Sequence, residues 1–417
     1  MLPLSQQIRK AVAAQHGEMA EFTRELVRIP TQNPPGQDYR ACAEALARMI
    51  RRAGLRATVE KIVPPKHLAS GASSPSSAEP RYWVRATLGS GNRALYFHGH
   101  YDVVPASSPV QFHPRERSGN IFGRGTADMK GGLVAMLYAA RVLKELQVPL
   151  DGRIELAFVP DEETGGQRGT AALFESGALA PDAIGMLTAE PTGGAIWNAS
   201  RGAVTMRVTI RGKSAHVGLS FRGVNAFERM LVVARALEKE KQRISKRKTK
   251  FRIEPDAARR SILLLGGRTE GGTNFNAVPA ECSFTVDRRI NPEENIAKEK
   301  TGLLAIMNRM RRAGIQIETS IFQEGNSVAM PESQPLARAL AKSIQEITRR
   351  APQFVMCPGL LETRFYAQRK IPALACGPGR LSVSHGPHEF ISVREMEHCA
   401  AIYALTAANL LGGKERK

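Results

Sequence analysis

Apolar and polar positions in the first half of the chain repeat one order of elements. Short apolar runs typical of strands occur at 93–97 (RALYF), 153–160 (RIELAFVP) and 183–193 (AIGMLTAEPTG), and polar residues end each run or follow it. Helical spacing of apolar residues follows, most clearly at 131–146 (GGLVAMLYAARVLKEL). Strands that alternate with helices predict an α/β fold with a mostly parallel sheet and helices on both faces.

The pattern changes near residue 200. The segment GAVTMRVTIRG (202–212) alternates with a period of two, which is typical of a half-exposed strand in an antiparallel sheet. Further strands and two helices follow up to residue 322 in a ferredoxin-like, α+β order. We therefore predict two domains, a discontinuous domain formed by 1–199 and 320–417, and a smaller inserted α+β domain at 200–319.

Three N-terminal segments complete the expected fold. Residues 5–29 and 38–53 have helical periodicity, and the turn-forming sequence TQNPPGQ separates them. Residues 64–80 are rich in Pro, Ser and Ala and are expected to form a surface loop.

Composition narrows the environment in which the chain is expected to work. The 417 residues are 42% hydrophobic, and the five cysteines are scattered without a CxxC pair. An odd, unpaired set of cysteines favours a reducing compartment, and we expect a cytoplasmic protein. The N-terminus is expected to be an amphipathic helix and not a signal peptide, and no run of 18 apolar residues suggests a membrane span.

The formal charge of +20 has two interpretations. A basic surface can steer small anionic molecules toward a protein, or it can bind nucleic acid. Basic residues gather at 238–252 (EKEKQRISKRKTKFR), but no RRM, zinc-finger or P-loop signature accompanies them. We therefore expect no nucleic-acid partner and no membrane partner.

Residues that can bind metal ions gather where the predicted strands end. They are His100, Asp102, Asp128, Asp161, Glu162, Glu163, Glu190, His385, His388 and Glu389. In a largely parallel sheet, functional side chains collect at the carboxyl ends of the strands. Imidazole and carboxylate groups are the ligands expected for zinc and similar divalent ions, and a shared carboxylate would make a two-metal centre.

The adjacent pair Glu162–Glu163 suits a division of roles. Neighbouring residues point in different directions, so one carboxylate can bind metal while the other accepts a proton from water. Taken singly, each cluster has a structural explanation, because a histidine at a strand end is often structural and a DEE run is often a solvated face. Their joint occurrence at successive strand ends favours a metal site.

Several of these motifs together resemble a known family. They are HGHYDVVP (98–105), GRGTADMKGG (123–132), DEETGG (161–166), AEPT (189–192), GKSAHVG (212–218), NAVPAE (276–281), DRR (287–289) and SHGPHEF (384–390). In this order and spacing the chain resembles the dinuclear zinc aminoacylase/carboxypeptidase family, which includes acetylornithine deacetylase, succinyl-diaminopimelate desuccinylase, carboxypeptidase G and related dipeptidases. The resemblance implies that the inserted domain is a lid and dimerisation domain.

The resemblance implies a role for each residue of the metal centre. His100 and Glu190 would bind the first ion, and Glu163 would bind the second. Asp128 would bridge the two ions, and its peptide bond to Met129 would be cis. Two divalent ions are implied, zinc first, with cobalt or manganese as alternatives.

Three further residues complete that implied centre. Asp102 would orient His100, and Glu162 would be the general base. The family pattern of His, two variable residues, Asn or Asp, and then Glu makes His385 the last ligand, with His388 as the alternative.

A second set of residues is implied to contact the substrate. His216 would stabilise the oxyanion in the active site of a partner subunit, and Asn276 and Arg289 would bind the substrate carboxylate or the tetrahedral intermediate. A surface salt bridge is the alternative for Arg289.

The C-terminal motifs add to this set. Arg364, Gly377 and Gly379 would line the substrate region, the two glycines through their N–H groups. Leu361 and Glu362 depart from the family pattern G-x-S/T-D-x-R-F.

The expected function is hydrolysis of the amide bond of an N-acyl amino acid by a metal-bridged water, with Glu162 as general base. The MKGG motif and the length favour an enzyme of the acetylornithine or succinyl-diaminopimelate type, acting as a homodimer. A metallo-carboxypeptidase or dipeptidase of the same family is the alternative. A catalytically inactive basic binding protein is a third possibility, although no ligand or base is missing from the motifs.

Overall fold

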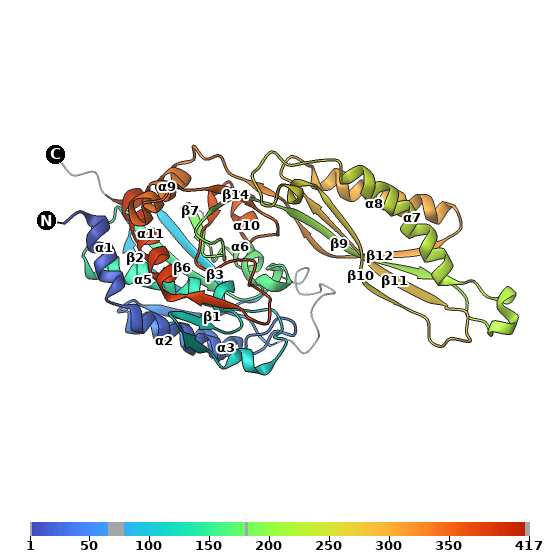
Figure 1. Ribbon diagram of the computed structural model, residues 1–417, viewed down its shortest axis with the longest axis horizontal. Coiled ribbons are helices and arrows are strands. Elements are labelled where there is room, and N and C mark those ends of the chain that lie inside the picture. Colours follow the sequence, from blue (N-terminus) through green and yellow to red (C-terminus); the bar gives the residue numbers. More distant parts are fainter. Residues whose placement is uncertain (1, 66–78, 180–181, 413–417) are drawn as a thin grey trace. The chain divides into compact units, whose positions relative to one another are not determined.

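The computed structural model describes residues 2–65, 79–179 and 182–412, and most of the loop predicted at 64–80 lies outside them. The chain divides into two compact units (Figure 1). The first unit comprises Met1–Asn198, Met330–Val355 and Glu362–Lys417, and the second comprises Ala199–Ala329 and Met356–Leu361. The predicted domain boundary at residue 320 falls inside a strand, β12 (Gln316–Gly325), which lies wholly in the second unit.

Most strands of a nine-stranded sheet belong to the first unit, and β13 belongs to the second. The strand order is β1-β2-β6-β3-β7-β15-β8-β13, with β14 (Phe354–Cys357) pairing to β8. The four strands β6 (Gly152–Val159), β3 (Ala94–His100), β7 (Ala183–Thr188) and β15 (Ala373–Ala375) are mutually parallel. Antiparallel strands flank them, namely β1 (Ala57–Lys61), β2 (Tyr82–Ser90), β8 (Ile196–Ser200) and β13 (Val328–Ala329). The carboxyl ends of the parallel strands therefore meet at one edge of the sheet.

Helices cover both faces of this sheet, as predicted. Side chains alternate along β3, so that Leu95 and Phe97 enter one apolar core while Ala94 and Tyr96 enter the other. The first core is shared with α5 (Gly131–Glu145), α9 (Pro335–Thr348) and α11 (Val393–Leu411). The second is shared with α6 (Ala172–Glu175) and α10 (Thr363–Ala367).

The N-terminal periodic segment forms two helices instead of the one predicted at 5–29. They are α1 (Leu4–Ala13) and α2 (His16–Val27), and the second predicted segment forms α3 (Tyr39–Arg52). Between Val12 and Met19 no residue is buried, so no core contact requires the helix to continue through this stretch. Apolar spacing alone did not show that break.

The second unit is a four-stranded antiparallel sheet with two helices on it (Figure 1). Along the chain its elements are β9 (Gly202–Arg211), α7 (Ala226–Ile244), β10 (Ile262–Gly271), β11 (Glu281–Ile290), α8 (Ile296–Arg312) and β12. This is the predicted β-α-β-β-α-β order, and the sheet order β10-β11-β9-β12 leaves β10 and β12 at the edges. The side chains of Asn225 and Asn295 cap the N-termini of α7 and α8.

Short elements complete the described residues. They are η1 (Pro109–Phe112), β4 (Arg115–Arg117), β5 (Asn120–Phe122), η2 (Thr126–Lys130), η3 (Glu162–Thr164), η4 (Gln167–Ala171), η5 (Val217–Arg222), η6 (Asp256–Arg259), β14 (Phe354–Cys357) and β16 (Phe390–Ser392). Within the described ranges, no helix combines the length and apolar character needed to cross a lipid bilayer.

Candidate metal centre

The predicted ligands come from the carboxyl ends of the parallel strands and the segments beyond them. His100 is the last residue of β3, Glu163 lies in η3 just after β6, and Glu190 follows β7. Asp128 lies in η2 before α5, and its peptide bond to Met129 is cis, which confirms that expectation. Because these strands are parallel neighbours, their ends bring residues that are distant in sequence to one edge.

The ligand atoms form two groups that share Asp128. His100, Asp128 and Glu190 make one group, and Asp128, Glu163 and His385 make the other, with the ligand atoms of each group within 4.8 Å of one another. Nε2 of His100 lies 3.2 Å from Oδ1 of Asp128, whereas Nε2 of His385 lies 3.3 Å from Oδ2. The two oxygens of one carboxylate thus face two different ligand groups, which is the arrangement of a bridging ligand.

Two buried polar atoms at this point lie close to each other without forming a hydrogen bond. Nε2 of His100 and Oδ1 of Asp128 are buried and make no hydrogen bond to any described residue. A buried polar atom without a partner is costly, and a cation placed among these groups would satisfy both atoms. The donor set of two imidazoles and three carboxylates fits a pair of divalent ions.

Protonation in the metal-free chain reflects the same crowding. Burial raises the pKa of Glu190 to about 8, and repulsion from Asp128 adds to it. Hydrogen bonds to Asp128 and Glu163 raise the pKa of His385 to about 10. Protons therefore occupy positions that cations can take, because metal ligands bind in their deprotonated forms.

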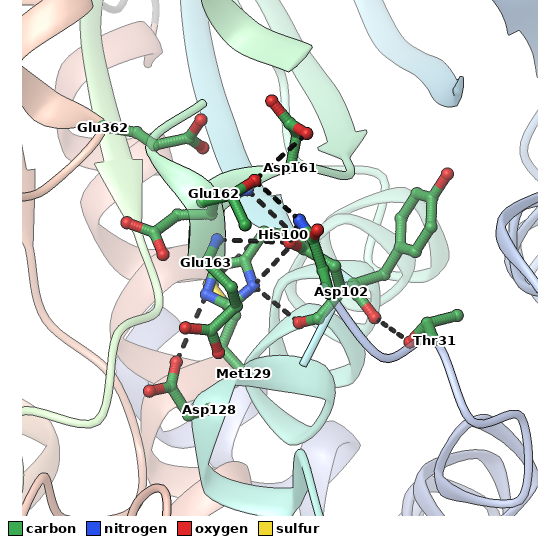
Figure 2. A network of polar contacts seen from close by, with 12 residues as sticks. Thr31, His100, Asp102, Asp128, Met129, Asp161, Glu162, Glu163 and Glu362 are labelled. Atoms are coloured by element: carbon green, nitrogen blue, oxygen red, sulfur yellow. Dashed lines mark hydrogen bonds and ion pairs between the residues drawn. The ribbon is translucent and has the colours of Figure 1, made fainter. Parts of the chain in front are cut away.

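Glu162 and Glu163 lie in the same loop, but their side chains have different surroundings. Figure 2 shows Glu163 extending toward Asp128, and its Oε2 lies 3.4 Å from Nε2 of His385. Glu162 is in neither ligand group. Burial raises the pKa of Glu162 well above its usual range, and the nearby carboxylates of Glu190 and Glu163 contribute. A carboxylate with raised proton affinity beside a metal centre is suited to general base chemistry.

Asp102 has a broader role than the one expected. Nδ1 of His100 lies 3.0 Å from the backbone oxygen of Asp102 and 3.5 Å from its carboxylate oxygen Oδ1 (Figure 2). The carboxylate instead accepts the backbone N–H groups of Glu162 and Glu163, both at 3.2 Å. Asp102 therefore contacts the imidazole mainly through its main chain. Its side chain fixes the loop 161–166 that carries Glu162 and Glu163, called the glutamate loop below.

The His-Gly-His pattern in β3 separates a structural histidine from a ligand. His98 is buried, with Nε2 2.7 Å from Glu362 and Nδ1 3.1 Å from the hydroxyl of Tyr366. Gly99 lies against Met129 and Leu133, and a Cβ there would come within 2.6 Å of both side chains. The glycine allows Leu133 of α5 and Met129, which precedes that helix, to approach the strand between the two histidines.

His385, and not His388, reaches the ligand group. His388 is exposed and contributes to neither ligand group. The backbone of His385 is left-handed, with φ 63°, and its carbonyl accepts a hydrogen bond from Arg124. Arg124 also pairs with Glu389 at 2.6 Å, and Glu389 accepts the N–H groups of Ala127 and Asp128. One buried ion pair therefore positions both the bridging aspartate and the last histidine.

Several residues that support the metal ligands were not predicted from the sequence. Asn33 donates to the Asp102 carboxylate at 2.8 Å, and Thr31 donates to the carbonyl of Tyr101. Both lie in the TQNPPG stretch, whose composition indicated only a turn. Arg124 lies inside the GRGTAD motif, and the signal that could have singled it out is a cation four residues from a metal ligand.

Two predicted substrate residues lie side by side in the second unit. His216 pairs with Ala277 in an isolated bridge, and the N–H of Val217 donates to the carbonyl of Asn276. The imidazole of His216 is exposed, and its Nδ1 accepts the N–H of Gly218. In a neutral imidazole the other nitrogen then carries the proton and is a free donor.

Arg289 and Arg364 have different surroundings. Nε of Arg289 donates to Asp287 at 3.0 Å in a partly exposed pair, which is the salt bridge named as its alternative. Arg364 is buried, donates to the carbonyl of Gly165 in the glutamate loop, and stacks 4.1 Å from the ring of Phe365. Burial lowers the pKa of Arg364, while Glu162 and Glu362 counteract that effect.

The two glycines predicted to bind substrate through their N–H groups use those groups within the protein. The N–H of Gly377 donates to Thr192 at 3.0 Å, and that of Gly379 donates to Glu395 at 3.2 Å. Gly377 is needed for close packing, because a Cβ there would lie 2.3 Å from the carbonyl oxygen of Ala189. These N–H groups therefore have partners within the protein, and the carbonyls of Gly377 and Gly379 accept the N–H groups of Gly194 and Gly193 in the loop that follows Glu190.

Comparison with known proteins agrees with the fold and identifies the family. Residues 96–409 match the model of peptidase family M20/M25/M40, and the chain belongs to this family. A solved M20 family metallo-carboxypeptidase from Sulfolobus solfataricus superposes with a TM-score of 0.76 at 16% identity, covering 94% of this chain and all of the other.

Two curated relatives share more local sequence. A probable succinyl-diaminopimelate desuccinylase of Staphylococcus aureus (strain Mu50 / ATCC 700699) is 32% identical over 236 residues, which are 52% of this chain and 58% of the relative. The chain therefore matches a little over half the length of that relative. An N-formyl-4-amino-5-aminomethyl-2-methylpyrimidine deformylase of Bacillus subtilis (strain 168) is 23% identical over 414 residues, covering 93% of both chains.

Proposed function

We propose that this protein is a metal-dependent amidohydrolase that removes the acyl group from an N-acyl amino acid. The observation that carries the proposal is the division of the Asp128 carboxylate between two ligand groups, with Glu162 half-buried beside them but in neither. A carboxylate that no ligand group uses, placed next to a two-cation site, is suited to proton transfer and not to metal binding.

The ligand groups define what the cations would contribute. His100, Asp128 and Glu190 would hold one divalent ion, and Asp128, Glu163 and His385 the other, with zinc expected first and cobalt or manganese as alternatives. Such ions, when bound, polarise a carbonyl oxygen and lower the pKa of water.

Glu162 performs the proton transfers in this proposal. Its raised pKa gives it the proton affinity to accept a proton from the attacking water, and the same proton then passes to the departing nitrogen. The N–H of Glu162 donates to Asp102, which fixes the loop from which the side chain projects. Arg364 donates to the carbonyl of Gly165 in the same loop and limits its movement.

The names of the two curated relatives favour a deacylase over a peptidase. One is named a desuccinylase and the other a deformylase, and both names describe removal of an acyl group from nitrogen. Cleavage of a peptide by a carboxypeptidase or dipeptidase uses the same chemistry, so this reaction is the second candidate. The net charge of +20 suits a substrate that carries a carboxylate.

A second copy of the chain is the proposed partner. Exposed apolar side chains lie on α7 and on the adjoining edge strand β10, namely Phe227, Leu231, Val232, Ile262 and Leu264. Such a surface on a sheet edge favours association. His216 and Asn276 are exposed in the same unit, and His216 would stabilise the oxyanion in the partner's site.

Hydrolysis of a substrate panel tests the proposal. The metal-loaded protein is incubated with N-acetyl, N-succinyl and N-formyl amino acids and with dipeptides, and amine release is measured. Cleavage of N-acyl amino acids at least tenfold faster than dipeptides supports the deacylase. Faster cleavage of dipeptides establishes the second candidate, and no cleavage of any amide by protein that holds its metal refutes the proposal.

A further inference from the structure

A second cavity in the first unit is separate from the metal centre. It has a volume of about 750 Å³ and lies among the loop 193–195, the C-terminal end of α9 and the first turns of α11. Neither the five predicted metal ligands nor Glu162 line it. Its volume is within the range of cavities that hold small organic ligands.

Four arginines line this cavity without partners of their own. Arg9, Arg349, Arg350 and Arg394 come from α1, the end of α9 and the start of α11, and none of these side chains makes an ion pair or hydrogen bond with a described residue. Elsewhere in the first unit, buried or half-buried arginines such as Arg81 and Arg124 have carboxylate partners. The positive charge of the cavity is therefore not neutralised within the described residues.

Two carboxylates lie near the four arginines and offset only part of their positive charge. Glu395 lines the cavity but accepts the N–H of Gly379 at 3.2 Å. Glu397, in an adjoining cavity that shares Arg9, Arg394 and His398, pairs with His16. Burial lowers the pKa of His398, and the charges of Arg394 and Arg9 add to this effect. Positive groups from α1 and α11 thus lie close together.

Part of the remaining lining is apolar. Ile344 and Ile347 of α9 and Ile402 of α11 line the same cavity. In addition, Ser392 is the N-cap residue of α11, and its side chain makes no capping hydrogen bond. The positive end of this 19-residue helix therefore adds to the charge of the cavity. Charged and apolar groups thus meet in one concave site, whereas a solvated basic surface would offer charge alone.

We infer that this cavity binds a small organic dianion that carries its negative charges on an apolar body. Guanidinium groups bind both phosphate and carboxylate oxygens in pairs, so either group can supply the charge. The isoleucines contact the apolar body and exclude water from it, which strengthens the ion pairs at the rim. This site is independent of the proposed hydrolysis, because no side chain that lines the cavity is a predicted metal ligand or the general base Glu162.

Binding of four small probes to the full-length, metal-loaded protein tests the inference. 1-Naphthyl phosphate and 2,3-naphthalenedicarboxylate carry two charges on an apolar body, inorganic phosphate carries charge alone, and 1-naphthol carries the apolar body alone. Isothermal titration at physiological ionic strength is expected to show saturable binding of one equivalent of at least one naphthyl dianion. Inorganic phosphate and 1-naphthol are expected to bind at least tenfold more weakly, and the stronger of the two dianions identifies phosphate or carboxylate as the preferred group.

Substitutions locate the binding. The double variant Arg349→Gln, Arg394→Gln should weaken binding of the dianion at least tenfold, while Arg338→Gln, an exposed and unpaired arginine of α9 outside the cavity, should change it less than twofold. Unchanged melting temperature and hydrolytic activity in all variants would show that they are folded. Non-saturable binding, equal loss in the control variant, or inorganic phosphate binding as tightly as the naphthyl dianions would overturn the inference.

Discussion

The two sets of residues predicted to act in catalysis differ in how completely the chain positions them. In the first unit, His100, Asp128 and Glu190 are buried, and their loops are held by Asp102 and by the Arg124–Glu389 pair. In the second unit, His216 is exposed, and its Nδ1 accepts the N–H of Gly218 in its own turn. A buried and fully supported cluster shows its chemistry in its geometry, whereas an exposed histidine with a free donor needs something outside its own unit.

The largest expected effect separates proton transfer from metal binding inside the buried cluster. Replacing Glu162 with Gln removes the proton acceptor but keeps the shape, so kcat should fall by about 10³-fold or more. Metal content should be unchanged, because Glu162 belongs to neither ligand group. Amide hydrolysis and metal analysis of the same preparation check both parts, and near-normal turnover in this variant would remove Glu162 from the mechanism.

The exposed histidine should matter only across a dimer. We expect His216→Ala to lower kcat by about 10²-fold, the size of the loss of one oxyanion donor, with little change in melting temperature. Mixing His216→Ala with the inactive Glu162→Gln variant should restore activity to about a quarter of the normal value, because mixed dimers form half of a random pool and hold one complete site each. If the mixture stays as inactive as its parts, His216 does not act in the partner's site.

How much was predictable follows from the same contrast. The α/β order, the inserted antiparallel unit and the residues that form the ligand groups could be predicted, because apolar periodicity and strand-end motifs are local in sequence. The positions of Asn33, Arg124 and Glu389 depend on contacts between distant segments, and turn composition or a single charge does not indicate such contacts. The break between α1 and α2 was missed because exposed residues carry no periodic signal.

Substitution of a residue that holds the metal ligands in place should have a smaller effect. Glu389→Gln weakens the pair with Arg124 and the hold on the N–H groups of Ala127 and Asp128, so metal affinity should fall by about 10- to 100-fold. Excess metal should restore most of the activity. Glu155→Gln, which alters a buried carboxylate paired to Arg85 and Arg153, is the matched control and should keep normal metal affinity. Equal weakening in both variants would indicate general destabilisation.

Metal binding by the unchanged chain should also depend on pH in a graded way. The raised pKa values of Glu190 (about 8) and His385 (about 10) mean that both groups hold protons at pH 7 in the metal-free protein. Cations must displace these protons, so affinity should rise with pH, by about tenfold per unit for each proton released. Titration calorimetry from pH 6 to pH 8 in buffers of different ionisation enthalpy measures the protons released. An affinity independent of pH would contradict this protonation pattern.

The central claim is that one aspartate joins two cations, and counting bound metal after saturation and removal of excess ion tests it most directly. Mass spectrometry of the metal content should give about two divalent ions per wild-type chain and close to none for Asp128→Asn, because both ligand groups lose a shared member. A wild-type chain that binds one ion or none, or an Asp128→Asn chain that still binds two, would contradict the account.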